Sequence, residues 1–244
     1  MTLTRLGCAG WSISREAAPS FEGAGSHLER YAAVFNAVEI NSSFYRPHKP
    51  QTYARWADSV PDEFRFSVKL PRSITHDQRL QDAGSLIDRF AAEASALGNK
   101  LGCVLVQLPP SLGLDTDAAA SVFQQLQGHF DCMLACEARH ASWFSDEATA
   151  LLRAHHITRV IADPPAGAPG RYVATTEQAY VRLHGSPRIY YSSYDEAYLR
   201  SVATWLAGRD GWCIFDNTAA GAAILNALQM MKLQATAPVP VLHT

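Results

Sequence analysis

The chain has 244 residues, 48% of them hydrophobic, and a formal net charge of −2. No segment approaches the roughly 18 consecutive apolar residues that a membrane-spanning helix needs. The net charge supplies no strongly basic face for holding nucleic acid nonspecifically. Because the N-terminus enters an apolar segment almost at once and shows no secretory pattern, we expect a cytoplasmic protein with no membrane partner.

Eight short apolar segments run along the chain, and nearly every one stops at a polar or charged residue. Stretches with helical character separate them, and this alternation is typical of parallel sheets with right-handed crossovers. The segments comprise residues 5–11, 37–41, 65–69, 101–108, 133–140, 159–163, 180–185 and 212–217. Polar strand ends on one face are typical of (β/α)8 barrels of about 250 residues. We therefore predict an α/β fold, a TIM-like (β/α)8 barrel with eight parallel strands.

An open doubly wound sheet is the alternative interpretation of the same alternation. That fold usually binds its ligand beside a glycine-rich first turn, whereas Trp11 stands in the first turn of this chain. A barrel is therefore favoured. We expect a single domain over residues 1–244, with residues 1–4 and 235–244 as short tails.

The segments between the strands predict seven helices. Ser26 and Glu29 form a capping-box pattern at the start of the first one. Six helices are expected over residues 26–36, 86–97, 116–126, 146–155, 195–207 and 219–233, and a further short helix is expected to begin at Pro50. The stretch PPAGAPGRYVATTEQ after Asp163 is too rich in proline and glycine for a crossover helix. The sixth unit is therefore expected to be irregular.

Charged residues spaced two apart on a strand share one face, as in the triple Tyr180, Arg182 and His184. The outer face of a barrel strand packs on apolar helices, so these side chains should point inward. They would form either a functional site or a structural ion-pair layer that plugs the barrel. The candidate catalytic residues are Glu39, Lys69, Glu137, Arg139, Arg182 and His184. The residues expected to bind substrate are Trp11, Asn41, Tyr45, Arg72, His76, Gln107, His140, Trp143, Asp163, Tyr191, Asp216 and Asn217.

The candidate residues have distinct expected roles. Glu137 or Glu39 would act as general base, and His184 and His76 would carry protons near neutral pH. The cations would hold an anion or stabilise developing negative charge. Fixed cations at the predicted mouth are as numerous as carboxylates, which favours an anionic ligand over a divalent metal. No metal-spaced cluster or cofactor motif is present, and the five cysteines are expected in the core.

These features favour an enzyme that acts on a small polar anionic metabolite, such as a sugar phosphate or a hydroxy acid. The expected chemistry is metal-independent acid/base catalysis by a lyase, isomerase or hydrolase. One alternative is a nucleic-acid-binding or phosphodiester-processing protein that grips phosphates with the basic loop KLPRSITHDQRL. Another is a ligand sensor that uses the same pocket without catalysis. The sequence leaves the substrate, the reaction type and the oligomeric state open.

Several long motifs carry a resemblance to a known family. GCAGW, YAAVFNAVEINSSFYRP, FRFSVKLPRSITHDQRL, KLGCVLVQLPPS, EARHASW, YVRLHG and FDNTAAGAAILNA occur in this order. Together they resemble the YecE-like family, the domain of unknown function numbered 72. The resemblance implies a TIM-like barrel without an established activity, and its characteristic polar positions match most of the candidates above. Asp216 stands where the family pattern usually has asparagine, which adds a carboxylate to the expected site.

Overall fold

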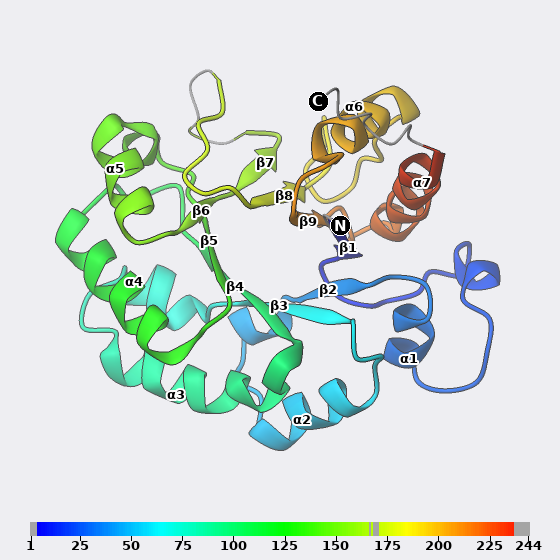
Figure 1. Cartoon of the computed structure of the whole chain (residues 1–244), viewed down its shortest axis with the longest axis horizontal. Coiled ribbons are helices and arrows are strands. Elements are labelled where there is room, and N and C mark those ends of the chain that lie inside the picture. The colour runs from blue at the N-terminus through cyan, green and yellow to red at the C-terminus, as the bar shows by residue number, and fades with distance from the viewer. Residues whose placement is uncertain (1–3, 166, 168–170, 237–244) are drawn as a thin grey trace, which may run out of the picture.

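The computed structural model describes residues 4–165, 167 and 171–236, and its helices lie outside its strands (Figure 1). The strands of this part of the chain are β1 (Thr4–Cys8), β2 (Ala37–Ile40), β3 (Arg65–Lys69), β4 (Leu101–Gln107), β5 (Met133–Glu137), β6 (Thr158–Arg159), β7 (Ile161–Asp163), β8 (Ala179–Leu183) and β9 (Gly211–Phe215). The α-helices are α1 (His27–Ala32), α2 (Pro50–Asp58), α3 (Gly84–Ala94), α4 (Thr116–His129), α5 (Asp146–Ala154), α6 (Glu196–Leu206) and α7 (Ala222–Thr236). The shorter turns are η1 (Ala18–Ser20), η2 (Ser42–Phe44), η3 (Ser73–Asp77), η4 (Ser95–Lys100) and η5 (Ala141–Phe144).

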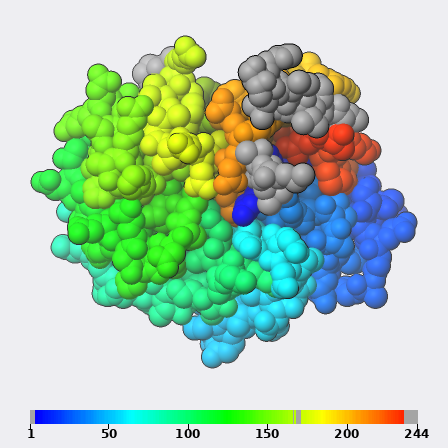
Figure 2. All heavy atoms as spheres, in the orientation of Figure 1, coloured from blue at the N-terminus to red at the C-terminus, as the bar shows by residue number. Residues whose placement is uncertain are grey.

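The strands form two parallel sheets, one in the order β1-β9-β8-β7 and the other in the order β2-β3-β4-β5-β6. The predicted α/β class and parallel pairing are confirmed. The segment expected as one sixth strand is instead two short strands, β6 and β7, with Val160 between them. The two sheets also meet where β1 lies beside β2, and there a single β-bridge joins Ala9 to Glu39. Helix α7 packs against β1, and Figure 2 shows the red surface of this helix beside the blue surface of N-terminal segments.

Side chains complete the contact between β1 and β2. The hydroxyl of Tyr31 accepts from the Cys8 amide at 2.7 Å and donates to the Ala37 carbonyl at 3.1 Å. Asn36 bridges the same strands by accepting from the Leu6 amide and donating to the Thr4 carbonyl. The backbones approach so closely that a Cβ on Gly7 would lie 2.0 Å from the Ala37 carbonyl oxygen. A glycine is therefore required at this position.

The helices follow the predicted order with changed boundaries. The capping box of Ser26 and Glu29 is confirmed at the start of α1. The third helix ends at Ala94 and continues as the turn η4, in which Gly98 has a φ of 58°. Helix α7 extends to Thr236 and so includes the first two residues of the predicted C-terminal tail, and the rest of that tail, residues 237–244, lies outside the described part of the chain. Strand β1 begins at Thr4, one residue before the predicted segment, and residues 1–3 also lie outside the described part.

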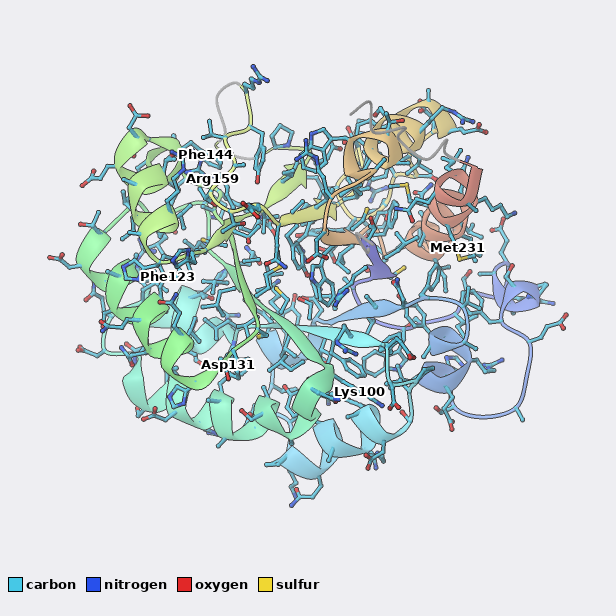
Figure 3. The ribbon with its side chains drawn as sticks, in the orientation of Figure 1. Lys100, Phe123, Asp131, Phe144, Arg159 and Met231 are labelled. Carbon is cyan, nitrogen blue, oxygen red and sulfur yellow. The ribbon has the colours of Figure 1, made fainter. Side chains whose placement is uncertain are left out.

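The sixth unit is irregular, as predicted: within the described residues no helix lies between β7 and β8. Hydrogen bonds from Arg159 hold the connection between β7 and β8 in place of a helix. The Arg159 guanidinium donates to the carbonyls of Val173 and Trp143 and to the hydroxyl of Thr149. It also lies 5.6 Å from the ring centroid of Phe144 (Figure 3). The connection after β7 is thus held to α5 by one buried arginine.

Two apolar clusters surround the strands. The larger lies between the strands and the helices, and the second gathers alternate strand residues. Members of the second cluster include Ala37, Leu105, Ala135, Tyr180 and Ile214. The residues two positions further along the same strands are Glu39, Gln107, Glu137, Arg182 and Asp216. Because residues two apart share a face of a strand, the second cluster continues into a polar layer at the C-terminal ends.

Four of the five cysteines are buried and Cys132 is half-buried, and all five are free thiols. Burial raises the pKa of Cys8, Cys132 and Cys136 to about 12 each. Their predicted role as small core residues is confirmed for the four buried ones. No helix among the described residues has the length and apolar character needed to cross a membrane.

Candidate active site

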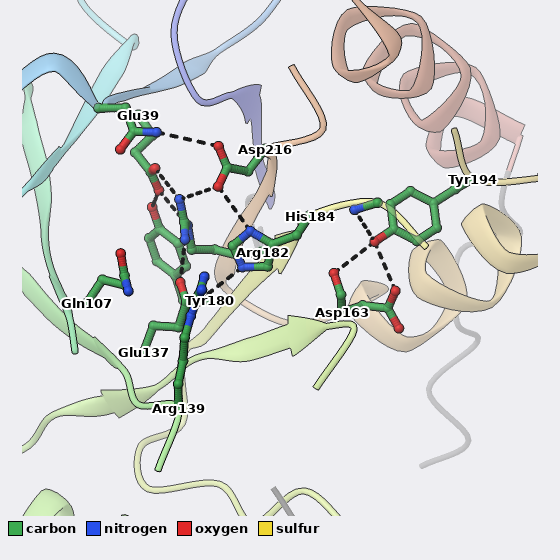
Figure 4. A network of polar contacts seen from close by, with 12 residues as sticks. Glu39, Gln107, Glu137, Arg139, Asp163, Tyr180, Arg182, His184, Tyr194 and Asp216 are labelled. Carbon is green, nitrogen blue, oxygen red and sulfur yellow. Dashed lines mark hydrogen bonds and ion pairs between the residues drawn. The ribbon is translucent and has the colours of Figure 1, made fainter. Parts of the chain in front are cut away.

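Arg182 on β8 lies at the centre of the polar layer and is fully buried. Its Nε and Nη2 atoms donate to the two carboxylate oxygens of Glu39 at 3.0 and 2.7 Å, a paired geometry typical of arginine and carboxylates. Nη2 also donates to Asp216 Oδ2 at 3.0 Å, and Nη1 donates to Glu137 Oε2. One guanidinium therefore joins carboxylates from three strand ends (Figure 4).

Glu137 at the end of β5 receives further donors. Arg139 donates to Glu137 Oε1 through Nε at 3.0 Å and Nη2 at 2.9 Å, and His184 Nε2 lies 3.1 Å from the same oxygen. Burial alone would raise the pKa of Glu137, but the charges of Arg182, His184 and Arg139 outweigh it and hold that pKa well below its usual value. A carboxylate so strongly held in its ionised form is a poor proton acceptor.

His184 joins two of the carboxylates. Its Nδ1 lies 3.0 Å from Asp216 Oδ2, and its Nε2 faces Glu137. Burial alone would lower the pKa of His184, but the hydrogen bonds to Asp216 and Glu137 outweigh it and raise that pKa. Both ring nitrogens can donate only in the imidazolium form, so His184 is a cation in this arrangement. We call the six residues of this cluster the carboxylate–arginine network: Glu39, Glu137, Arg139, Arg182, His184 and Asp216.

A polar layer below the network orients Glu39. The Tyr180 hydroxyl donates to Glu39 Oε2 at 2.9 Å, and it lies 2.7 Å from the hydroxyl of Ser67 on β3. The Tyr180 ring stacks on Trp212 with centroids 5.8 Å apart. The Glu39 carboxylate is thus fixed from below by a hydroxyl and from above by Arg182.

Lys69 at the end of β3 differs from its neighbours. It is two residues beyond Ser67 and therefore shares its face, and only 6% of the residue is exposed. Its Nζ lies 4.1 Å from the ring centroid of Phe44. Within the described part of the chain, no hydrogen bond or ion pair joins it to a carboxylate. Burial has the largest effect on the pKa of Lys69 and the charge of Arg182 the next, and together they lower it to about 8. The nearby carboxylates act in the opposite direction but are outweighed.

His76 lies beside Lys69 on the π-helical turn η3, a rare geometry that is frequent at functional sites. Its ring contacts Phe44 edge to face at 4.9 Å, and its Nδ1 lies 2.8 Å from the Thr75 hydroxyl. Burial first, and then the charges of Lys69 and Arg72, lower the pKa of His76. The imidazole is therefore neutral near pH 7.

Two further predicted residues border the network. The Asn41 amide donates to Asp216 Oδ1 at 3.4 Å, and its buried Oδ1 has no hydrogen-bond partner among the described residues. Gln107 is paired in register with Glu137 across β4 and β5, and it lies beside the network (Figure 4). An unpaired acceptor at Asn41 leaves one position where a ligand could donate a hydrogen bond.

Several residues predicted to bind substrate have their side-chain partners outside the carboxylate–arginine network. Trp143 is 1% exposed and its indole donates to the Leu112 carbonyl, so it packs in the core. Arg72 makes an exposed ion pair with Asp77. Asp163 accepts from the Tyr194 hydroxyl at 2.9 Å, apart from the network (Figure 4). These contacts depend on loop paths that strand periodicity does not reveal.

Other predicted substrate contacts have local structural partners. Trp11 packs on the edge of Trp56, and His140 caps η5 by accepting from the Ser142 amide. Asn217 is fully buried and donates to the Ser192 carbonyl and to Asn226. The remaining two are exposed aromatic residues at loop positions, Tyr45 and Tyr191. Asn217 therefore positions the loop after β8, and within the described residues no hydrogen bond or ion pair joins any of these five side chains to the network.

Several residues near the site were not among the predicted catalytic or substrate-binding residues, among them Phe44, Ser67, Thr75 and Tyr190. Tyr190 has a φ of 70°, and its ring lies edge to face on His184 at 6.0 Å. A positive φ is costly for a bulky residue and is often retained at functional sites. Sequence patterns do not reveal φ, but the adjacent tyrosines Tyr190 and Tyr191 in the loop after β8 are a signal that could have indicated this part of the site.

Among residues 4–165, 167 and 171–236, no group of three or more His, Cys, Asp or Glu side chains is arranged to hold a metal ion. The carboxylates of the network already accept hydrogen bonds from arginine and histidine.

Residues 5–243 match the family described as "Protein of unknown function DUF72". The chain belongs to this family. It is 34% identical to the protein YecE of Escherichia coli (strain K12) over 142 residues, 56% of this chain and 52% of YecE. This match therefore spans about half the length of YecE. YunF of Bacillus subtilis (strain 168) is 24% identical over 265 residues, 93% of each chain.

Solved structures show the same fold. A DUF72 family protein of Thermotoga maritima superimposes with a TM-score of 0.81 at 27% identity, covering 96% of this chain and 99% of that one. SacUVDE gives a TM-score of 0.60 at 8% identity, covering 96% and 98%. A sugar phosphate isomerase/epimerase of Parabacteroides distasonis gives 0.54 at 10%, covering 96% and 97%. At such identities the last two likenesses concern the fold alone.

Proposed function

We propose that this protein is an enzyme that binds a small polar anion at the carboxylate–arginine network and moves protons through Lys69 and His76. The observation that carries the proposal is the buried ammonium of Lys69, which lacks a carboxylate partner in the described part of the chain. Buried charges are normally paired. An anionic substrate would supply the missing partner.

The charge balance of the site supports an anionic ligand. Three carboxylates, Glu39, Glu137 and Asp216, face three cations, Arg139, Arg182 and protonated His184. The network is therefore neutral by itself. Lys69 adds one positive charge in a poorly solvated setting, where a fixed charge acts strongly on a bound anion.

The pKa directions support a changed assignment of roles. Glu137 or Glu39 was the expected general base, but the lowered pKa of Glu137 and the four hydrogen bonds donated to it make Glu137 an anchor for Arg182 and His184. Lys69 and His76 have pKa values displaced toward neutrality or below it. A general acid or base is most effective when its pKa lies near the working pH.

Ligand binding can be tested with defined anions. Wild type and Lys69→Met would be titrated with inorganic phosphate, glycerol 3-phosphate and lactate, with glycerol as the neutral control, by calorimetry and thermal shift. We expect the wild type to bind at least one anion, and Lys69→Met to lose at least tenfold in affinity. Binding that is equal in the two proteins, or no binding of any anion, would contradict the proposal.

Exchange of substrate protons with solvent distinguishes an enzyme from a ligand sensor. Hydroxy acids and sugar phosphates would be incubated with the protein in D2O, and exchange of the carbon-bound proton next to the oxygenated carbon would be followed by NMR. An acid/base enzyme exchanges or isomerises a bound substrate, whereas a sensor gains thermal stability without changing it. Binding without exchange for every anion that binds would favour the sensor.

We also infer that the two sheets act as one ring of eight strand positions. Two contacts support this inference: the Val160 amide donates to the Cys136 carbonyl, and the Gly10 amide donates to the Glu39 carbonyl. Counting β6 and β7 as one position leaves eight. In such barrels the active site lies at the C-terminal ends of the strands, where the network is found here.

A further inference from the structure

Lys69 has the surroundings of a nucleophilic amine. Its carboxylate neighbours are already bound by Arg182, Arg139 and His184, so none of them holds the ammonium by an ion pair. The aromatic ring of Phe44 tolerates the cation but forms no bond that must break before the nitrogen reacts. Desolvation and a neighbouring cation are the two conditions that activate lysine amines in enzymes.

We propose that Lys69, a cation without a carboxylate partner among the described residues, forms a reversible imine with a small anionic aldehyde or ketone. The inference rests on the proposed function, because the anionic group of the substrate must first bind near this cation. It narrows the substrate class from small anions to anionic carbonyl compounds.

The step is balanced without an oxidant or a cofactor. The neutral amine of Lys69 attacks the carbonyl carbon, a C–N bond forms, and the π electron pair moves to oxygen, which takes up a proton. The nitrogen gives up one proton to leave a neutral carbinolamine. The hydroxyl group of the carbinolamine then takes up a proton and leaves as water, the nitrogen lone pair forms the C=N bond, and the nitrogen gives up its second proton. A further proton on nitrogen yields the iminium ion.

Neighbouring groups fit the proton transfers of this sequence. His76 contacts the same Phe44 ring and is neutral near pH 7, so it can accept and return a proton. With a pKa of about 8, about a tenth of Lys69 side chains are neutral amines at pH 7, roughly 300-fold more than for an unperturbed lysine. Arg139 retains 19% of its side-chain exposure, so the network opens to solvent on this side.

Reductive trapping tests the inference. The protein would be incubated with glyoxylate and sodium cyanoborohydride at pH 7, and the modified lysines mapped by peptide mass spectrometry. The chain has four lysines: Lys49, Lys69, Lys100 and Lys232. Lys49 is exposed, whereas Lys100 donates to the carbonyls of Ala57 and Val60. We expect Lys69 to be carboxymethylated at least tenfold faster than Lys49, although it is far less exposed.

Two further measurements make the result specific. The trapping rate at Lys69 should rise with pH and level off above about pH 8, and inorganic phosphate should slow it by competing for the anion site. Lys69→Arg keeps the positive charge and removes the nucleophile, so it should retain anion binding while trapping at this position disappears. Modification that follows exposure, with Lys49 ahead of Lys69, would overturn the inference.

The outcomes also distinguish this inference from the proposed function. If anions bind the wild type and Lys69→Arg but not Lys69→Met, and glyoxylate is not trapped at Lys69, only the imine is wrong. If neither anion binding nor trapping is found, the proposed function fails as well.

Discussion

At the residue scale, most charged groups of the site are paired with an opposite charge, whereas Lys69 is not paired with a carboxylate among the described residues. Arg182 and the carboxylates around it form ion pairs with one another, so they act as a structural part of the fold. Lys69 is buried beside them without a carboxylate partner in the described residues. A buried charge without a partner lowers stability and persists only where it has a use.

Lys69→Met should therefore stabilise the protein while abolishing anion binding. We expect the free energy of unfolding at pH 7 to rise by about 1–3 kcal/mol, because the substitution removes an unpaired buried charge. The cost of that charge is fully present below about pH 8 and fades as the pH rises toward 10.5, where the unfolded lysine also loses its proton. Urea unfolding of both proteins from pH 7 to 10 measures the difference, and a less stable variant at pH 7 would contradict this account.

Arg182→Met should have the opposite effect. It leaves three buried carboxylates without their shared guanidinium, which should cost about 3–5 kcal/mol. Arg72→Met removes only an exposed ion pair and should change stability by less than about 0.5 kcal/mol. Equal midpoints for the two variants in urea unfolding would refute a structural role for the network.

At the element scale, the contact between β1 and β2 relies on side chains. Tyr31 and Asn36 both precede β2 in the chain. The Tyr31 hydroxyl pairs with backbone groups of both strands, and the Asn36 side chain pairs with two backbone groups of β1. In an ordinary ladder the backbone amides and carbonyls bond directly. Here a hydroxyl and an amide are inserted between the strands at the point where the first and second units meet.

Tyr31→Phe should destabilise the protein by about 2 kcal/mol, because it leaves the Cys8 amide and the Ala37 carbonyl buried without their partner. Tyr45→Phe is the matched control, because Tyr45 is 72% exposed. Urea unfolding and hydrogen exchange at the Cys8 amide report the effect. If that amide remains as protected in Tyr31→Phe as in the wild type, the hydroxyl does not hold the strands together.

At the scale of the whole molecule, the network makes stability depend on pH from two sides. Glu137 and Asp216 have lowered pKa values, so their contribution is present above their unfolded values of 4.5 and 3.8 and is lost as the pH falls through the folded ones. His184 has a raised pKa, so its contribution is complete below 6.5 and is lost as the pH rises through its folded value.

The combined contribution should therefore be largest between pH 4.5 and 6.5. His184→Gln should remove the decline on the alkaline side of this window, because no imidazole then takes up a proton from solution on folding under the influence of the Asp216 and Glu137 carboxylates. His129→Gln, which alters an exposed histidine, should leave the profile unchanged. Urea midpoints from pH 4 to 8 provide the test, and a wild-type profile that rises steadily from pH 5 to 8 would rule this mechanism out.

Local pattern was enough to predict the class of the fold and the membership of the network. Alternation along each strand determines which side chains share a face, and Glu39, Glu137, Arg182 and His184 were all predicted on this ground. The proline-rich stretch after Asp163 predicted the missing sixth helix for a similarly local reason. These features depend on residues only a few positions apart.

Only the tertiary structure decided which charges are satisfied. Pairing between Arg182 and Glu39 joins residues 143 positions apart, and strand periodicity contains no information about such distances. The same folding placed Trp143 and Asn217 in structural roles and left Lys69 with an aromatic ring in place of a carboxylate. Ion pairing depends on separations of a few ångströms between strands, so the sequence determined the inventory of the site and the packing of the strands decided the role of each member.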